Sequence, residues 1–107
     1  MRPSQAVPAE IFAALGDETR IKLVSRLCTE GPQSITELAS GTKVTRQGIT
    51  KHLRVMEHAG LVRSRRDGRE VIWKLEKRRL IVAQSYLDQI SRQWDEAVAR
   101  LKILVEG

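Results

Sequence analysis

Apolar residues recur at helical spacing through most of this chain, and short breaks rich in glycine, proline or aspartate divide the pattern into segments. An apolar face around Ile11, Phe12 and Leu15 predicts a short first helix that begins at Pro8, because proline suits the first turn of a helix. Residues 1–7 are then expected to form a flexible lead-in.

A second helix is predicted after Asp17, a residue type that readily caps a helix N-terminus. Its apolar positions are Ile21, Val24, Leu27 and Cys28, which recur at helical spacing. On this face Cys28 is expected to act as a small core residue.

Two further helices with N-terminal capping signals follow. Residues 34–37 (SITE) match a capping box and predict a short helix that ends near Gly41. Thr45 opens a longer helix that ends near residues 59–60. Its two faces are apolar (Ile49, Leu53 and Met56) and polar (Gln47, Thr50, Lys51, Arg54 and His58).

The next segment predicts a β-hairpin. Residues 61–66 and 69–75 are two β-prone runs on either side of Asp67-Gly68. We expect a type I′ turn with these two residues at its centre, both with positive φ.

From Lys77 onward no helix-breaking residue appears until Gly107, and the apolar positions follow a heptad. The repeat comprises Leu80, Leu87, Trp94 and Leu101, with Ala83, Ile90, Ala97 and Leu104 three residues after each. This stripe could pack on the core of its own domain, but a domain this small has little surface to cover it, which favours a dimer seam. The expected dimer interface comprises Phe12, Leu80, Leu87, Ile90, Trp94, Leu101 and Leu104.

The distribution of charge indicates an anionic binding partner. The net charge is +6, and residues 43–74 alone contain nine Lys/Arg against three Asp/Glu, so this stretch carries the whole excess. Such clustering favours binding to a polyanion over a merely solvated basic face. A single cysteine excludes an intrachain disulfide, and the chain shows neither a membrane-length apolar run nor an N-terminal signal segment, so we expect a cytoplasmic location.

The order of elements predicts a mainly α fold with a small β-hairpin, a winged helix-turn-helix that dimerises through its N- and C-terminal helices. We expect one domain over residues 8–107. Within it, the helix-turn-helix covers about 34–59, the wing about 62–75 and the dimerisation helix about 77–104.

Four motifs in this order resemble the ArsR family of bacterial winged-helix repressors. Residues 15–20 (LGDETR) resemble that family's ALADPTR opening, and residues 35–39 (ITELA) resemble the start of its helix-turn-helix. Residues 50–62 (TKHLRVMEHAGLV) are similar to its SKHLKVLEEAGLV signature, and residues 66–69 match its wing turn. The resemblance covers about residues 8–76 and implies a sequence-specific, double-stranded-DNA-binding homodimer, with repression of transcription as the expected outcome.

The polar stripe and the resemblance select nearly the same DNA-binding residues. Gln47 is the best candidate to read a base, because its amide can pair with adenine through two hydrogen bonds. Arginines of the wing are expected along the phosphates or in the minor groove. The candidates are Thr45, Arg46, Gln47, Thr50, Lys51 and Arg54 on the recognition helix, Arg65, Arg66 and Arg69 on the wing, and Ser34 and Thr36 as further backbone contacts.

Metal sensing and catalysis are not expected. In metal-binding members of this family the third helix carries a motif that resembles Cys-Val-Cys, whereas this chain has Glu37-Leu38-Ala39-Ser40 there. Residues 83–86 offer no paired Asp and His ligands. His52, part of the family signature, is expected to be structural. No nucleophile–base pair, phosphate-binding glycine loop or carboxylate pair is apparent, so we expect neither an enzyme nor a cofactor.

Two alternatives stay open. One is a redox- or ligand-responsive switch of the same fold, in which only a second subunit could supply a partner thiol for Cys28 and an unidentified small-molecule effector binds between the helices of the dimer. The other is a winged-helix protein-interaction module, which the clustered basic charge disfavours.

Overall fold

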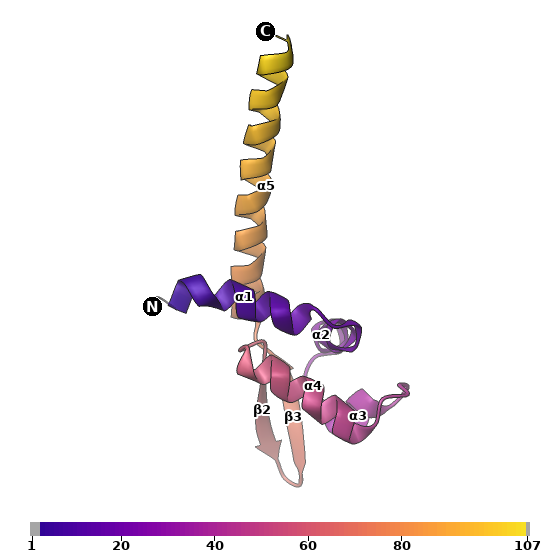
Figure 1. Ribbon diagram of the computed structural model, residues 1–107. Helices are drawn as coiled ribbons and strands as arrows, with labels where there is room; N and C mark the ends of the chain where they lie inside the picture. Colours follow the sequence, from indigo (N-terminus) through magenta and orange to yellow (C-terminus); the bar gives the residue numbers. More distant parts are fainter. Residues whose placement is uncertain (1–2, 107) are drawn as a thin grey trace.

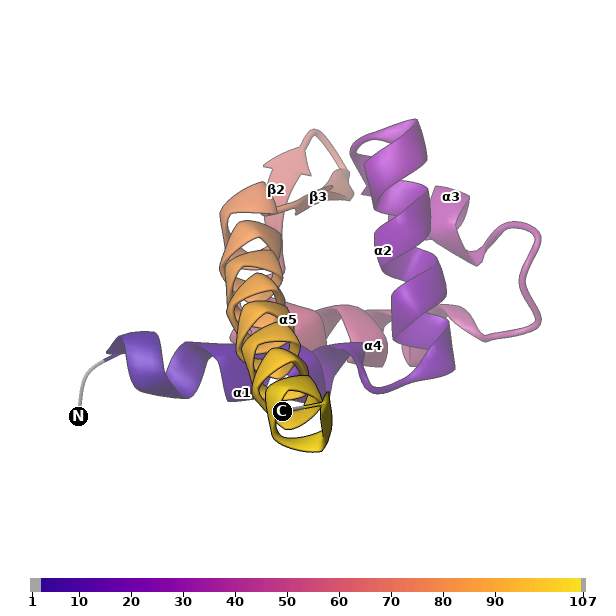
Figure 2. The same ribbon diagram turned by 90° about the horizontal axis from the view of Figure 1, so that it is seen from above.

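The computed structural model describes the backbone of residues 3–106 and the side chains of residues 9–106. The described residues form five helices and a small three-stranded antiparallel sheet of order β1-β3-β2, which confirms the expected winged fold (Figures 1 and 2). The elements are α1 (Pro3–Leu15), α2 (Glu18–Glu30), β1 (Gln33–Ser34), α3 (Ile35–Ala39), α4 (Arg46–His58), β2 (Val62–Asp67), β3 (Glu70–Leu75) and α5 (Lys77–Glu106).

The first helix begins earlier than predicted. It starts at Pro3 rather than Pro8, so the expected lead-in is wrong for residues 3–7, while residues 1–2 lie outside the described residues. Pro3 can occupy the first helical position, where the missing N–H costs no hydrogen bond. Pro3 and Pro8 both suit the first turn of a helix, so the sequence pattern alone could not decide at which of them the helix begins.

Local capping fixes where the next helices begin, as predicted. The Asp17 carboxylate accepts the backbone N–H of Arg20 at 3.0 Å at the start of α2. Ser34 and Glu37 form the complete capping box of α3, and the Thr45 hydroxyl accepts the N–H of Gly48 at 3.0 Å at the start of α4.

One apolar core joins α1–α4, the sheet and the first turns of α5. The inward-facing side of α4 was predicted correctly, since Ile49, Leu53 and Met56 are all buried. The buried apolar residues are Ile11, Ala14, Leu23, Leu27, Leu38, Ile49, Leu53, Met56, Ala59, Leu61, Val62, Trp73, Leu75 and Ala83.

The core-facing side of α2 was predicted only in part, since Leu27 is buried and Val24 packs against the core as expected. Leu23 and Leu27 are buried, whereas Ile21 is 54% exposed and Cys28 is exposed, so Cys28 is not a core residue. Both faces of this helix carry apolar residues at helical spacing, and only packing against α4 and the sheet selects the face that contains Leu23 and Leu27.

The sheet differs from the prediction in two ways. Gln33 and Ser34 add a third strand beside β3, in register with Trp73 and Ile72. The hairpin loop consists of Gly68 and Arg69, because Asp67 pairs with Glu70. Only Gly68 has positive φ, at +64°, so the predicted type I′ turn centred on Asp67-Gly68 is wrong; a glycine alone at the first loop position is typical of type II′.

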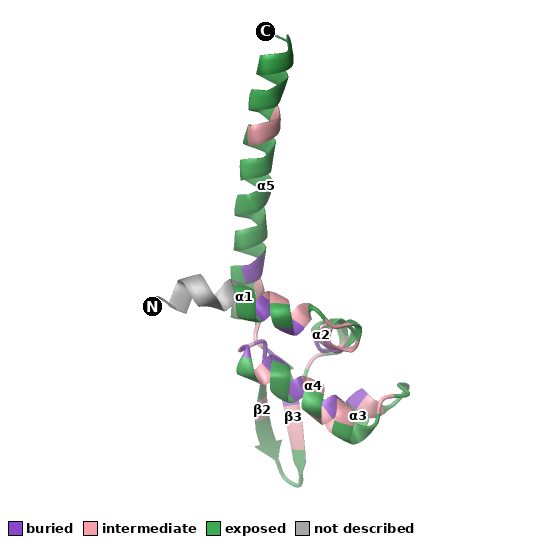
Figure 3. Ribbon diagram, in the orientation of Figure 1, coloured by how far each residue is buried: buried purple, intermediate pink, exposed green. Residues whose placement is uncertain are grey.

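The last helix leaves the globular part and extends beyond it as a single rod (Figure 1). Near its start Leu80 is half-buried and Ala83 is buried, and Tyr86 lies against Phe12 with ring centroids 5.9 Å apart. Almost all of the helix after Ala83 is exposed (Figure 3). The exposed heptad residues are Leu87, Ile90, Trp94, Leu101 and Leu104.

In the described part of the chain, no helix combines the length and the apolar character needed to cross a membrane.

Candidate nucleic-acid interface

The tandem helices α3 and α4 are held by contacts that the sequence did not reveal. Arg26 of α2 donates to the backbone carbonyls of Glu37, Leu38 and Ser40 at 3.0–3.2 Å, at the end of α3 where helix carbonyls lack their full set of intrahelical partners. Leu38 packs in the core with Ile49. An arginine on the preceding helix therefore fixes the short helix from which the turn to α4 starts.

The outer face of α4 carries the predicted polar stripe. Gln47, Lys51 and Arg54 are exposed and recur at spacings of four and three residues, which aligns them along one face of the helix. Arg46 is also exposed, whereas Thr50 is half-buried and its hydroxyl donates to the carbonyl of Arg46 at 2.9 Å. Within the described residues the side chains of Arg46, Gln47 and Lys51 make no hydrogen bond or ion pair, so their polar groups are available to a ligand.

Arg54 differs from the rest of the stripe because it binds within the protein. Its guanidinium donates to the Glu57 carboxylate at 2.9 Å and lies 5.3 Å from the centre of the buried Trp73 ring. Ser64 of β2 donates to the other oxygen of Glu57 at 3.2 Å. Arg54, Glu57 and Ser64 together link α4 to the base of the wing. In the sequence, only the three-residue spacing between Arg54 and Glu57 indicated part of this role of Glu57.

The two faces of the wing carry different arginines. Strand alternation puts Ser64 and Arg66 on the same face as Trp73, which is the face that packs against α4. Arg65 lies on the opposite face with Arg63 and Lys74. Arg65, Arg66 and the turn residue Arg69 are all exposed. In Figure 1 the hairpin tip and the α3–α4 pair lie at the end of the molecule opposite the C-terminus of α5.

A small hollow of about 190 Å³ brings the recognition helix and the wing turn together. Thr36 of α3, Arg46 at the start of α4 and Arg69 of the wing turn line it. Ser34 also borders this hollow, but it is only 3% exposed and its hydroxyl accepts the Glu37 N–H. Of the two predicted backbone-contact residues, Thr36 is therefore exposed toward this surface and Ser34 is occupied as a helix cap.

His52, on the inner side of α4, contacts the corner between α1 and α2. Its Nδ1 lies 3.3 Å from the Arg20 guanidinium and 3.7 Å from the Asp17 carboxylate. The backbone N–H of Arg20 lowers the pKa of the Asp17 carboxyl, and the charges of His52 and Arg20 lower that pKa further, although desolvation opposes them. This contact helps to orient α4.

No cluster of three or more His, Cys, Asp or Glu side chains within the described residues is arranged to hold a metal ion.

Comparisons with known proteins agree with this geometry. A family model described as a helix-turn-helix domain matches residues 15–65. The chain is 32% identical over 100 residues to the HTH-type transcriptional regulator Rv2034 of Mycobacterium tuberculosis, covering 94% of this chain and 90% of that protein. It is 35% identical to the solved ArsR-like transcriptional regulator from Rhodococcus sp. RHA1, with a TM-score of 0.82 and 96% of each chain covered.

The fold is also shared with a more distant structure, the homodimeric winged helix-turn-helix DNA-binding domain Mb0332 of Mycobacterium bovis. The identity is 19% and the TM-score 0.66, over 83% of this chain and 81% of that one.

These relatives are transcriptional regulators rather than enzymes. Their similarity over nearly the whole chain, together with the tandem helices and the arginine-rich wing, identifies this protein as a transcriptional regulator of the ArsR family with a DNA-binding winged helix-turn-helix.

Proposed function

We propose that this protein is a repressor that binds a pseudo-palindromic operator as a homodimer and reads each half-site with α4. The observation that carries the proposal is the exposed outer face of α4, where the side chains of Arg46, Gln47 and Lys51 make no hydrogen bond or ion pair within the described residues. Exposed polar side chains without partners in their own protein are typical of a surface that contacts base edges and phosphates.

The residues of this face differ in what they can recognise. The Gln47 amide suits adenine, and the Arg46 guanidinium suits guanine or a phosphate. The Thr45 hydroxyl already accepts the Gly48 N–H but can still donate to a phosphate, as can Lys51. Arg54 is engaged by Glu57, so we assign it to positioning the wing as well as to the DNA backbone.

The wing supplies the second half of the proposed contact. Arg66 and Arg69 lie on the side of the hairpin and at the turn that adjoin α4, and both are suited to phosphates or to a narrow minor groove. Arg65, on the opposite face, is expected to contribute less to affinity.

Dimerisation is supported by the uncovered heptad of α5. Its apolar residues beyond Ala83 are exposed, and Trp94 is 69% exposed. A stripe of this length in water favours a second copy as its cover. The homodimeric description of the M. bovis domain, which shares the fold, agrees with this assembly. Two-fold symmetry then predicts half-sites about 10–10.5 bp apart.

The proposal is tested by titrating the purified protein against its own upstream DNA and a scrambled duplex over a range of salt concentrations. We expect tight binding to the native fragment, weak binding to the scramble, and a steep loss of both with salt. Equal affinity for both duplexes would leave only non-specific DNA binding, and absence of binding at low salt would contradict the proposal.

Two substitutions distinguish base recognition by α4 from phosphate binding by the wing. Gln47→Ala should reduce the preference for the native fragment and leave the salt dependence largely intact. Arg66→Ala should weaken binding to all duplexes alike and lower the salt slope by about one. Arg92→Ala, a matched charge removal on exposed α5, should change neither.

Repression itself is tested by transcription in vitro from the bound promoter. The wild-type protein should reduce transcript yield in proportion to operator occupancy, and Gln47→Ala should reduce it less. An increase in transcript would make the protein an activator.

A further inference from the structure

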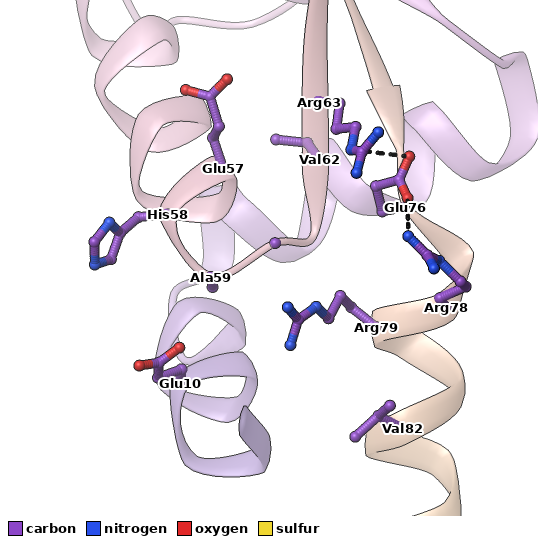
Figure 4. A pocket seen from close by; sticks show the side chains of 11 residues that line it. Glu10, Glu57, His58, Ala59, Val62, Arg63, Glu76, Arg78, Arg79 and Val82 are labelled. Carbon is purple, nitrogen blue, oxygen red and sulfur yellow. Dashed lines mark ion pairs between the residues drawn. The ribbon is translucent and has the colours of Figure 1, made fainter. Parts of the chain in front are cut away.

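A hollow of about 700 Å³ lies at the C-terminal end of α4 (Figure 4). Four elements meet around it: α1, the C-terminal end of α4, the start of β2 and the first turns of α5. Its lining comprises Glu10, Glu57, His58, Ala59, Gly60, Val62, Arg63, Glu76, Arg78, Arg79 and Val82.

Acidic and basic side chains lie mainly on opposite walls of this hollow. Glu10 and Glu57 come from α1 and α4, whereas Arg63, Arg78 and Arg79 come from β2 and α5 on the other side (Figure 4). Glu76 also belongs to the arginine side. Three arginines and three glutamates balance in number, so the hollow is polarised without an excess of either sign.

Most of these charges already have partners. Glu57 binds Arg54 and Ser64 outside the hollow. Glu76 lies 3.7 Å from Arg63 and 3.9 Å from Arg78. Glu10 and Arg79, one from each wall, are left, and neither has an ion-pair or side-chain hydrogen-bond partner among the described residues.

The position of Arg79 depends on Gly60. Gly60 ends α4 with φ +79°, and its N–H and that of Leu61 bond back to Glu57 and Met56 at 2.9 Å each. A Cβ at Gly60 would lie 2.8 Å from Arg79 Nε, so the guanidinium stem packs directly on this glycine. Arg79 is half-buried, and its N–H groups face the hollow without an acceptor from the described chain.

We propose that this hollow binds a small zwitterion, with a carboxylate on Arg79 and an ammonium group toward Glu10. A planar guanidinium with free donors suits a carboxylate. The first turn of α5, Lys77-Arg78-Arg79, contains no acidic residue and adds the positive end of a helix dipole on the same side.

A zwitterion fits the lining better than a simple ion does. A plain anion on Arg79 would leave Glu10 without a counter-charge, and a plain cation on Glu10 would leave Arg79 without one. Val82, which is 38% exposed, lines the hollow on the α5 side and, with the small residues Ala59 and Gly60 at the end of α4, suits a short aliphatic body. α-Amino acids with aliphatic side chains have this combination of groups.

The ligand would also connect the two functional parts of the molecule. The hollow contacts the end of the recognition helix, the base of the wing and the start of α5, so bound ligand would change how these three elements sit against one another. This consequence for DNA affinity rests on the proposed function, whereas binding of the ligand does not.

The experiment is isothermal calorimetry of the full chain without DNA. The probes are L-valine, L-leucine, L-isoleucine and L-methionine. 4-Methylpentanoate, which is leucine without the amine, and 3-methylbutylamine, which is leucine without the carboxylate, are matched controls. We expect saturable binding of at least one amino acid, and at least about tenfold weaker binding of both leucine fragments, since each lacks one charge-assisted contact. Binding of none of the amino acids, or equal binding of a fragment, would overturn the proposal.

Substitutions of single residues test whether the ligand binds in this hollow. Arg79→Gln should weaken the bound amino acid by about tenfold or more and Glu10→Gln by a smaller factor, because Glu10 is more exposed. Lys77→Gln, a charge removal in the same turn that does not line the hollow, should leave affinity unchanged. Light scattering on Arg79→Gln provides a further check. If the variant changes the oligomeric state and leaves ligand affinity intact, Arg79 serves a subunit contact and the proposal fails.

The effect on DNA is measured separately, by repeating the operator titration at saturating ligand. A change in operator affinity in wild type that disappears in Arg79→Gln links the site to regulation. Loss of all operator binding, with calorimetric binding retained, would overturn the proposed function and leave the ligand site standing.

Discussion

The globular part of the molecule, up to about Ala83, and the remainder of α5 contain apolar residues in the same helical rhythm, but these residues are covered differently. In α4, Leu53 and Met56 are fully buried by other elements of the chain. In α5, Leu101 is 60% and Leu104 80% exposed, although their heptad is more regular (Figure 3). Periodicity thus identifies the apolar side of a helix but not what covers it.

The difference also concerns what stabilises each region. Neighbours within the chain hold α4 through its core face and through Arg54, Glu57 and His52. The distal part of α5 has few such neighbours, and most of the stability of a helix in a protein comes from the packing of its apolar face. We therefore expect the stability of the globular part to be independent of protein concentration and that of distal α5 to depend on it.

The largest expected effect is a core truncation in the globular part. Leu53→Ala removes a fully buried side chain and should lower the free energy of unfolding by about 2–5 kcal/mol, through lost burial and the cavity left behind. Leu101→Ala, the same truncation in distal α5, should change it by less than about 0.5 kcal/mol at low protein concentration. Urea denaturation followed by circular dichroism measures both, and equal losses would remove the distinction between the two regions.

A smaller effect is expected at the proposed seam. Trp94→Ala should weaken the dimer by about 2 kcal/mol, more than tenfold in Kd, because truncation of a central interface aromatic is costly. Sedimentation equilibrium measures this, with Arg92→Ala as the control on the same helix. A dimer of undiminished affinity in the Trp94 variant would show that the heptad is not the seam.

The N-cap of α4 allows a smaller change in the stability of the globular part to be tested. Thr45→Ala removes the acceptor for the Gly48 N–H and should cost about 1 kcal/mol of stability. Thr45→Ser retains the hydroxyl and should restore most of the loss. Thermal unfolding of the three proteins in parallel decides the matter; an Ala variant as stable as wild type would mean that Thr45 does not stabilise the helix start.

The smallest effect expected is a pH dependence at the corner that His52 contacts. The pKa of Asp17 is lowered in the folded state, chiefly by the Arg20 N–H, so the ionised form is favoured by folding. Its contribution is present above its unfolded pKa, about 4, and is lost as pH falls through the lower folded value.

Asp17→Asn keeps a capping acceptor without the charge and should flatten this loss between about pH 5 and 2, while Asp17→Ala should destabilise at neutral pH as well. Denaturation series at several pH values compare the three proteins. A wild-type profile that coincides with that of Asp17→Asn would contradict the assigned cause.

Much of the DNA-facing surface could be predicted because it depends on local signals. The caps at Asp17, Ser34 and Thr45 and the polar stripe of α4 are each encoded within a few residues. The contacts of Arg26 with the end of α3, and that of Glu57 with Ser64, join residues 7 to 14 positions apart and required the fold to be seen.

The sequence by itself determined the helices, the hairpin, the basic stretch and the family, because periodicity, capping and charge are properties of neighbouring residues. The tertiary structure decided which face of α2 is buried, the pairing of Gln33–Ser34 with β3, the loop residues of the wing, and the meeting of Glu10 with Arg79 around one hollow. These outcomes depend on packing between segments far apart in the chain, where several faces or registers satisfy the local pattern and only the shared core selects one.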